Sequence, residues 1–331
     1  MSVIIAAHNE AENLPTLLAA LQKQSYPKNL RKFIVIDDRS SDGTHEVLEE
    51  WKSRLPLRSL RIESVPEGVN PKKFALAEGI RQARGEVIVT TDADCTPPPR
   101  WLELIASAFE KDVGAVVGVS PWYVEGKFSG KVFALESFAT ALVSLAGVGH
   151  GRPFLAVGRN FAFRRELFGS VRGYDSDMHI FSGDDDLLLQ KISGLPAVRV
   201  AAVFSDESIV PSRGAENLRA FIRQKRRHIS SSKVYPRKVQ LGYTLYHASN
   251  LILWLSPFFW GLMGFGILLL KFLVDGLIFH HTMRRCRLEI SWTAFAPWEA
   301  LFLFIHIFVG PMSFVGRIRW KKSRTPKAFC R

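Results

Sequence analysis

Short apolar runs alternate with amphipathic helical patterns over residues 1–205. The apolar runs are continuous, as is typical of parallel strands buried on both faces, and they lie at 3–6, 33–36, 87–89 and 114–117. Between the first two runs, leucines repeat with the spacing of one helical face, at Leu14, Leu17, Leu18 and Leu21. This alternation predicts an α/β open sheet flanked by helices. In such sheets, ligands bind beyond the carboxyl ends of the strands.

The last third of the chain has a different pattern, because residues 239–283 carry only two formal charges. The uncharged stretch 251–270 is long enough for one membrane helix at about 1.5 Å per residue. The whole run is long enough for a helical hairpin, with Pro257 and Gly261 near its turn. A second apolar block, 300–316, predicts either a further membrane helix or a re-entrant or interfacial helix. A buried core helix is the alternative for both blocks.

The net charge of +13 is concentrated beside this apolar region. Residues 211–240 hold nine basic side chains against one acidic one, and residues 281–331 hold ten against two. A nucleic-acid-binding protein would more often carry such charge on its folded domain, so no nucleic acid is expected as a partner. Basic flanks next to apolar helices are typical of the cytoplasmic side of a membrane. We therefore expect a multi-pass protein of the cell inner (cytoplasmic) membrane with a cytoplasmic catalytic domain.

These patterns divide the chain into three expected parts. They are a catalytic α/β domain at 1–210, a basic amphipathic interface segment at 211–238 and a membrane region of two to three apolar helices at 239–331. A hairpin would return the chain to the cytoplasm near residues 280–287. A third crossing would then place the basic tail, 317–324, outside the cell, whereas an interfacial third helix would keep it inside.

Acidic side chains cluster after the apolar runs, as Asp37-Asp38, Asp92-Ala93-Asp94 and Asp184-Asp185-Asp186. Crowded like charges are unfavourable unless a cation or a hydrogen-bond donor lies among them. The pair Asp92 and Asp94 suits Mg²⁺ or Mn²⁺, which also takes oxygens from a substrate phosphate and neutralises a diphosphate leaving group. Capping of the following turn is the alternative.

The other two clusters also have two interpretations each. Asp37 and Asp38 either form a local turn or accept the imino N–H of a nucleotide base. One of Asp184, Asp185 and Asp186 either caps a helix or acts as a general base, since neighbouring carboxylates raise one another's pKa. The basic stretch 216–236 is either a helix on the membrane surface or a source of diphosphate contacts from Lys225, Arg226 or Arg227.

Five segments in this order resemble glycosyltransferase family 2, whose members have the GT-A fold. They are "VIIAAHNEAENLPTLLAAL" (3–21), "VIDDRSSDGT" (35–44), "TDADC" (91–95), "SGDDDLLLQ" (182–190) and "QKRRH" (224–228). The resemblance covers about residues 2–235. His228 stands where the QxxRW element of the family has tryptophan, and this departure weakens the case for a processive polymerase.

The resemblance implies a role for each matching residue. Asp37 and Asp38 would contact the base and ribose of a UDP- or GDP-sugar, and Lys73 or its neighbour Lys72 would approach the nucleotide. The metal and the sugar diphosphate would be held by Asp92 and Asp94.

The resemblance also implies the catalytic base and the acceptor side. Asp185 would deprotonate the acceptor hydroxyl, or Asp184 if the register slips by one, with inversion at the anomeric carbon. Gln224 and Arg227 would border the acceptor and the diphosphate.

We therefore expect a membrane-anchored glycosyltransferase that moves one sugar onto a lipid or lipid-linked acceptor. A polyprenyl phosphate, a diacylglycerol and a hydroxylated lipid are the candidate acceptors. A processive polysaccharide synthase is the alternative within the class, although it needs enough helices for a channel. A nucleotidyltransferase is a further enzyme alternative. Its chain would open with a Gly-rich loop, whereas residues 6–10 of this chain read AAHNE. The non-enzyme alternative is an inactive membrane scaffold of the same fold.

Overall fold

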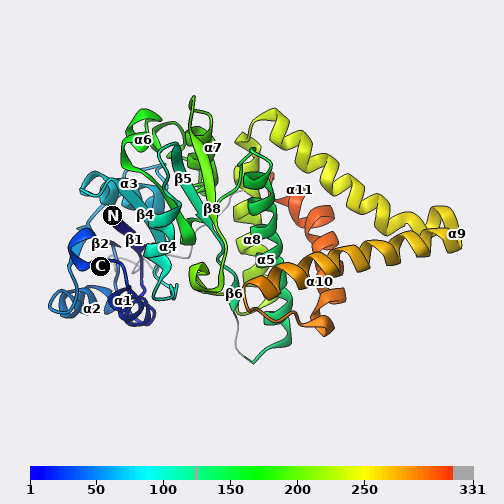
Figure 1. The fold of residues 1–331 in the computed structure, drawn as a ribbon, viewed down its shortest axis with the longest axis horizontal. Coiled ribbons are helices and arrows are strands. Elements are labelled where there is room, and N and C mark those ends of the chain that lie inside the picture. The colour runs from blue at the N-terminus through cyan, green and yellow to red at the C-terminus, as the bar shows by residue number, and fades with distance from the viewer. Residues whose placement is uncertain (124–125, 316–331) are drawn as a thin grey trace, which may run out of the picture.

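The computed structural model describes residues 1–123 and 126–315, and its centre is a seven-stranded sheet (Figure 1). The strands are β1 (Ser2–Ala7), β2 (Lys32–Asp38), β3 (Leu57–Ile62), β4 (Val87–Asp92), β5 (Val113–Gly118), β7 (Phe161–Arg164) and β8 (Arg199–Val203). Their order is β3-β2-β1-β4-β7-β5-β8. Strand β7 is antiparallel to both of its neighbours, and the other pairs are parallel. The fold is therefore the predicted open α/β sheet, and the antiparallel strand β7 makes it a mixed one.

Helices cover both faces of this sheet, as its continuous apolar strands require. One face packs against α1 (Leu14–Gln22), α2 (Thr44–Trp51) and α4 (Trp101–Ala108). The opposite face packs against α3 (Pro71–Arg81), α6 (Arg165–Ser170) and α7 (Asp186–Ser193). Alternate residues of β1 enter the two cores, with Val3 and Ile5 on the first face and Ile4 on the second.

A second group of helices lies beside the last strands of the sheet (Figure 1). It contains α5 (Phe128–Gly149), α8 (Leu218–Ser230), α10 (Trp292–Phe304) and α11 (Gly310–Met312). The two-residue strands β6 (Trp122–Tyr123) and β9 (Ser212–Arg213) pair where the chain enters this group. Apolar side chains of α5 and α10 form one core with the end of α9, including Phe138, Phe279 and Trp298.

Helix α9 (Arg237–Arg285) is a hairpin of two arms. The chain reverses at Trp260 and Gly261, whose backbone angles are not helical, and Gly261 has a φ of +51°. The arms meet at the end of the molecule that lies farthest from the sheet (Figure 1). The sequence predicts either one membrane helix over residues 251–270 or a helical hairpin, and the chain adopts the hairpin. Its turn lies in the middle of residues 251–270.

Three helical segments of the described residues are long and apolar enough to cross a membrane, judged by length and composition alone. They are Phe128–Gly149, Arg237–Arg285 and Trp292–Met312. The first of them lies within the part of the chain expected to be catalytic, and its apolar pattern was not recognised in the sequence. The predicted basic tail at 317–324 lies outside the described residues.

Candidate active site

The predicted acidic clusters meet at the carboxyl edge of the parallel strands. In the strand register, Ala7 of β1 lies beside Asp37 of β2, and Ala6 lies beside Asp92 of β4. A cavity of about 1670 Å³ opens at this edge. Acidic residues from all three clusters line it, namely Asp38, Asp92, Asp94, Asp184, Asp185 and Asp186.

Lys72 connects two of these clusters. Its ammonium nitrogen lies 2.9 Å from a carboxylate oxygen of Asp92 and 2.9 Å from one of Asp184. Asn70 places Lys72 at the start of α3, because its side chain accepts hydrogen bonds from the backbone N–H groups of Lys72 and Lys73. Burial lowers the pKa of Lys72, but the charges of Asp184 and Asp92 outweigh it, so the net shift is upward. Lys72 is therefore a fixed positive charge between Asp92, at the end of β4, and Asp184, just before α7.

Lys73, one of the two lysines expected to approach the nucleotide, lies elsewhere. Its side chain is fully buried and donates to the backbone carbonyl of Asp177 at 2.9 Å and to the carboxylate of Asp177 at 3.0 Å. It is not among the residues that line the cavity. The structure thus brings Lys72, and not Lys73, to the predicted site.

Asp94 is held beside Asp92 at the loop that follows β4. Burial and then the charge of Asp92 raise the pKa of Asp94 to about 6, although the charge of Arg159 acts in the opposite direction. The hydroxyl of Ser212 donates to Asp94 at 3.3 Å. This carboxylate is therefore under-compensated by the surrounding protein groups.

The donor set of this pair fits a hard divalent cation only in part. Among the residues that the structure describes, no group of three or more His, Cys, Asp or Glu side chains is placed to hold a metal ion. Two carboxylates, Asp92 and Asp94, face the cavity. Mg²⁺ is commonly held by one or two carboxylates together with phosphate oxygens, so the pair fits such an ion when a diphosphate is bound.

The three consecutive aspartates before α7 have different surroundings. Asp184 pairs with Lys72; burial raises its pKa, but Lys72, Lys73 and Arg227 together lower it, and the net pKa is below the usual value. Asp185 accepts hydrogen bonds from the backbone N–H groups of Gly158 at 2.6 Å and Asp186 at 2.8 Å. Burial and then the charge of Asp184 raise the pKa of Asp185. Of these two carboxyls, Asp185 is the better proton acceptor near neutral pH.

Asp186 connects α7 to the segment that follows α8. Its carboxyl accepts hydrogen bonds from the hydroxyls of Tyr235 and Ser231. Burial and then the charge of Asp185 raise its pKa to about 8. These contacts give Asp186 a positioning role, because they hold the segment after α8 against the start of α7.

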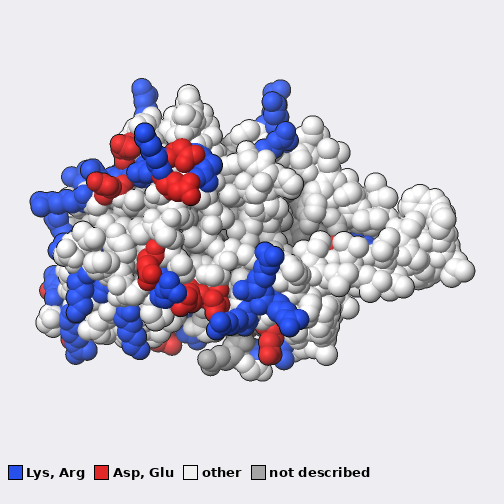
Figure 2. Space-filling model, viewed as in Figure 1, with Lys and Arg blue, Asp and Glu red and all other residues white. Residues whose placement is uncertain are grey.

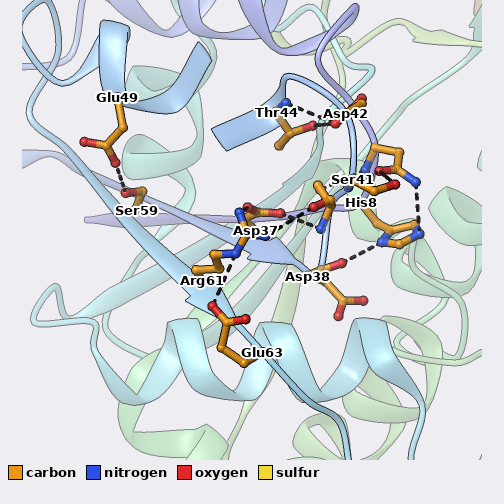
Figure 3. A network of polar contacts seen from close by, with 12 residues as sticks. His8, Asp37, Asp38, Ser41, Asp42, Thr44, Glu49, Ser59, Arg61 and Glu63 are labelled. Carbon is orange, nitrogen blue, oxygen red and sulfur yellow. Dashed lines mark hydrogen bonds and ion pairs between the residues drawn. The ribbon is translucent and has the colours of Figure 1, made fainter. Parts of the chain in front are cut away.

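The β2 cluster contains two carboxylates with different surroundings, Asp37 and Asp38 (Figure 3). Asp37 is buried, accepts from the backbone N–H of Ser40 at 3.0 Å and lies 3.3 Å from a guanidinium nitrogen of Arg61. Asp38 lines the cavity and pairs with Arg39 at 2.7 Å. Asp37 therefore stabilises the turn, and Asp38 is the one of the pair that a ligand in the cavity would meet.

Helix α8 supplies the basic wall of the cavity, where Gln224, Arg227 and His228 all line it. A nitrogen of the Arg227 guanidinium lies 3.1 Å from Nε2 of His228. Burial lowers the pKa of His228 well below its ordinary value, and the charge of Arg227 adds to the effect. His228 is thus neutral at physiological pH, and the positive charge of this wall resides on arginine and lysine.

Two groups that the sequence analysis did not single out also line the cavity. Arg159 is held in place by Ser120, to whose hydroxyl and carbonyl its guanidinium donates at 2.9 Å and 3.0 Å. Glu136 of α5 pairs with Lys225 of α8 at 2.7 Å. No local sequence motif marks these residues, because their partners lie far away in the chain.

The far end of the cavity lies among the apolar helices. Residues of the first arm of α9 and of the α10 region line it, including Tyr243, His247, Leu251, Phe302 and His306. The rings of His247 and His306 stack with their centroids 3.7 Å apart. The cavity therefore runs continuously from the carboxylates at the sheet edge to the helices predicted to meet a membrane.

This fold is a GT-A fold, an open mixed sheet that carries acidic side chains at the carboxyl ends of its parallel strands. The family model described as "Glycosyl transferase family 2" matches residues 2–172. The chain belongs to this family.

Named relatives agree with the family assignment. The chain is 36% identical over 103 residues to Glycosyltransferase AglE of Haloferax volcanii, covering 31% of this chain and 33% of the relative. It is 30% identical over 179 residues to the dolichol-phosphate mannosyltransferase of Pyrococcus furiosus, covering 52% of this chain and 48% of the relative. The matches thus span a third to about half of the length of these curated relatives.

A solved structure extends the similarity beyond the family domain. Mannosyltransferase PcManGT from Pyrobaculum calidifontis, in complex with GDP-Man and Mn²⁺, matches 95% of this chain and 71% of its own with a TM-score of 0.53. The sequences are 20% identical, so the match concerns the fold.

Proposed function

We propose that this chain transfers one sugar from a UDP- or GDP-sugar to a hydroxyl or phosphate group of a lipid-linked acceptor at the cytoplasmic face of a membrane. The observation that carries the proposal is the continuous cavity that joins the acidic sheet edge to the apolar helices α9 and α10. A donor would bind at the polar end, and the lipid part of an acceptor would lie at the apolar end.

Named relatives support both the donor class and the acceptor class of this proposal. The relative in Pyrococcus furiosus is named for dolichol phosphate, and a Pseudomonas fluorescens relative, 30% identical over 124 residues, is named for undecaprenyl phosphate. The similar Pyrobaculum calidifontis structure contains GDP-Man and Mn²⁺. We extend these donor, metal and acceptor classes to this chain as part of the proposal.

The proposed division of labour follows the positions of the side chains. Asp38 would contact the nucleotide, and Asp37 would hold the turn that presents it. Of the two lysines that the resemblance offers for the nucleotide side, Lys72 would make the contact with the donor. Gln224 and Arg227 would border the diphosphate. Asp92 and Asp94 would hold Mg²⁺ or Mn²⁺, which when bound would neutralise charge on the leaving group.

Asp185 is the proposed general base. As the acceptor oxygen forms its bond to the anomeric carbon, the bond from that carbon to the diphosphate oxygen breaks, and the configuration inverts. Asp185 takes the proton of the acceptor hydroxyl, and Asp184, neutralised by Lys72, is the weaker base of the two. A phosphate acceptor is already ionised near pH 7 and needs no base, because its second pKa is about 6.

We keep the three expected parts of the chain, 1–210, 211–238 and 239–331, as the proposed organisation. Helix α5 joins the first part to the third, since it packs against α10.

A processive synthase is disfavoured because the described helices do not suffice for a separate channel. An inactive scaffold is disfavoured because it has no need for the crowded carboxylates at the sheet edge.

The test is sugar release and transfer by the purified protein in lipid, with a panel of UDP- and GDP-sugars and with Mn²⁺, Mg²⁺ or EDTA. We expect metal-dependent release from one donor. Asp185→Asn should retain donor binding and lower transfer to a hydroxyl acceptor by about 10²- to 10⁴-fold. The matched control is Asp175→Asn, at an exposed aspartate that does not line the cavity.

Each other outcome has a defined meaning. Asp185→Asn with full transfer to a phosphate acceptor would identify that acceptor class, and full transfer to a hydroxyl would move the base to Asp184. Full activity in EDTA would refute the metal role of Asp92 and Asp94. No release from any donor by folded protein would refute the transferase and favour the scaffold.

A further inference from the structure

The turn inside α9 divides the uncharged stretch 251–270 into two halves. The reversal at Trp260 and Gly261 leaves about ten residues on each side, which corresponds to about 15 Å of helix. The hydrocarbon core of a bilayer is about 30 Å thick, and a crossing helix needs about 20 apolar residues. Neither half is long enough to cross the core.

The parts of the arms nearer the catalytic domain are less uniformly apolar than these halves. The first arm begins with many polar side chains, which are Arg237, Lys238, Gln240, Thr244, His247, Ser249 and Asn250. The second arm carries Lys271 and Asp275 and ends in Arg284 and Arg285. The polar part of the first arm also lines the cavity, through His247 among others. In the inner half, exposed apolar side chains such as Leu245 and Leu277 are thus interspersed with polar ones, whereas the outer half carries no charged residue.

The tip of the hairpin is apolar and strongly exposed. Phe258 and Leu262 are 84% and 88% exposed, and Phe259 and Met263 beside them are exposed as well. Figure 2 shows this projecting part of the molecule as nearly free of charged side chains. A crossing hairpin would place its turn in head groups or water on the far side, where such side chains are unfavourable. Acyl chains are the surroundings that this tip matches.

A buried ionic group sets the depth of insertion. Lys271 pairs with Asp275 at 2.7 Å and with Glu299 of α10 at 2.6 Å. Lys271 lies ten residues after the turn, hence about 15 Å from the tip. Full crossing would place this group at the centre of the hydrocarbon, where ionised side chains are most costly. Insertion of the outer half alone keeps it near the level of the head groups.

The two arms are joined closely at the tip. The hydroxyl of Ser256 donates to the carbonyl of Gly264 at 2.9 Å. A Cβ atom at Gly264 would lie 2.1 Å from the carbonyl oxygen of Ser256, so only glycine permits this approach. The rings of Trp254 and Phe272 meet across the arms at 5.6 Å. The turn is therefore part of a packed element.

The other two apolar helices are held to the catalytic part. The indole of Trp298 in α10 donates to Glu136 of α5 at 3.0 Å. Helix α5 is in turn tied to neighbouring loops, since the hydroxyl of Ser137 accepts from the backbone N–H of Trp122 at 2.8 Å, and the hydroxyl of Ser144 donates to the carbonyl of Leu155. Helices fixed in this way suit the membrane surface.

We propose that α9 is a re-entrant hairpin, which inserts its tip among the acyl chains of one leaflet and returns both arms to the side of the catalytic domain. This arrangement replaces the multi-pass topology predicted from the sequence. It rests on the membrane association in the proposed function. It also explains how the cavity reaches the head groups, because the polar half of the first arm lines it at that level.

The test uses single cysteines in vesicles whose outer surface carries the catalytic domain. Cys330 is first replaced by serine, and Cys95 and Cys286 are buried. Leu262→Cys reports on the tip, and Leu241→Cys, at an exposed leucine near the base of the first arm, is the matched control. A membrane-impermeant maleimide is added outside, then to the lumen through a pore, and finally after detergent. Flotation of the vesicles measures membrane association separately.

A re-entrant tip predicts rapid outside labelling of Leu241→Cys. Labelling of Leu262→Cys should be at least about tenfold lower from either side and should recover in detergent, since a thiol in hydrocarbon does not form the reactive thiolate. Labelling of Leu262→Cys only from the lumen would overturn the proposal in favour of full crossing. Failure to float, with Leu262→Cys labelled from outside, would overturn both this proposal and the membrane part of the proposed function. Donor release would then still test the transferase itself.

Discussion

At the scale of single residues, Lys72 compensates the densest negative charge of the cavity. Its ammonium lies between Asp92 and Asp184, both at 2.9 Å. We expect Lys72→Met to lower the free energy of unfolding by about 3 kcal/mol in EDTA, because loss of one partner leaves buried charge uncompensated. Donor affinity should fall as well. Thermal or chemical unfolding in detergent and equilibrium donor binding measure the two effects.

The matched control is Lys52→Met, which removes an exposed lysine paired with Glu49 at 2.5 Å. Exposed pairs contribute little, so its effect should stay below about 1 kcal/mol. Added Mg²⁺ should restore part of the stability of Lys72→Met and none of that of the control. Equal effects of the two substitutions would show that Lys72 is not the compensating charge.

The same lysine shows which site residues could be predicted from the sequence. The aspartates at the strand ends were identifiable because a parallel sheet gathers those ends at one edge. Lys72 and Lys73 are neighbours on one helix and project in different directions, so the packing of α3 decides which one faces the cavity. Arg159 was missed because its position depends on Ser120, far away in the sequence.

At the scale of elements, Asp186 connects α7 with the segment after α8, through Tyr235 and Ser231. Its pKa is raised by burial and by Asp185 to about 8. Folding therefore favours its protonated form, and stability falls as the pH rises from the ordinary aspartate pKa near 4 towards 8. We expect Asp186→Asn, which stays neutral, to remove this fall.

The measurement is the melting temperature of both proteins in detergent from pH 5 to pH 9. The difference between Asp186→Asn and the wild type should shift in favour of the variant as the pH rises to about 8. Asp175→Asn, at an exposed aspartate, should differ from the wild type by a constant amount. A constant difference for Asp186→Asn too would mean that Asp186 is ionised throughout this range.

The elements themselves could be predicted unequally. The buried parallel strands and the Leu-rich face of α1 have clear periodicities, and both were recognised. Helix α5 has apolar residues all around it, because it packs against the catalytic part and against α10, so periodicity does not mark it. The antiparallel strand β7 has four residues, and its pairing with β4 and β5 depends on contacts distant in sequence.

At the scale of the whole molecule, charge and apolar surface lie at opposite ends (Figure 2). The composition predicts membrane contact as a property of the C-terminal third, but it does not determine the depth of insertion. That depends on the turn at Trp260 and Gly261, which converts one apolar stretch into two half-length arms. The length of an uncharged stretch thus predicts a crossing only when the chain does not reverse within it.

The two exposed arginines that end the second arm of α9 should give the molecule a preference for anionic lipid. Arg284 and Arg285 end the second arm and are exposed. Each basic residue near an anionic surface contributes about 1 kcal/mol, so Arg284→Gln with Arg285→Gln should lower the preference for anionic over neutral vesicles by about 30-fold. The control pair, Arg54→Gln with Arg58→Gln, lies on the α2 and β3 side of the sheet and should leave it unchanged. The measurement is the distribution of protein reconstituted into a mixture of the two vesicle types.

The difference between the arginine variant and the wild type should shrink in high salt, because screening shortens the range of these charges. A loss that persists at high salt would show that the arginines act through the packing of the arm, and the electrostatic explanation would then be wrong.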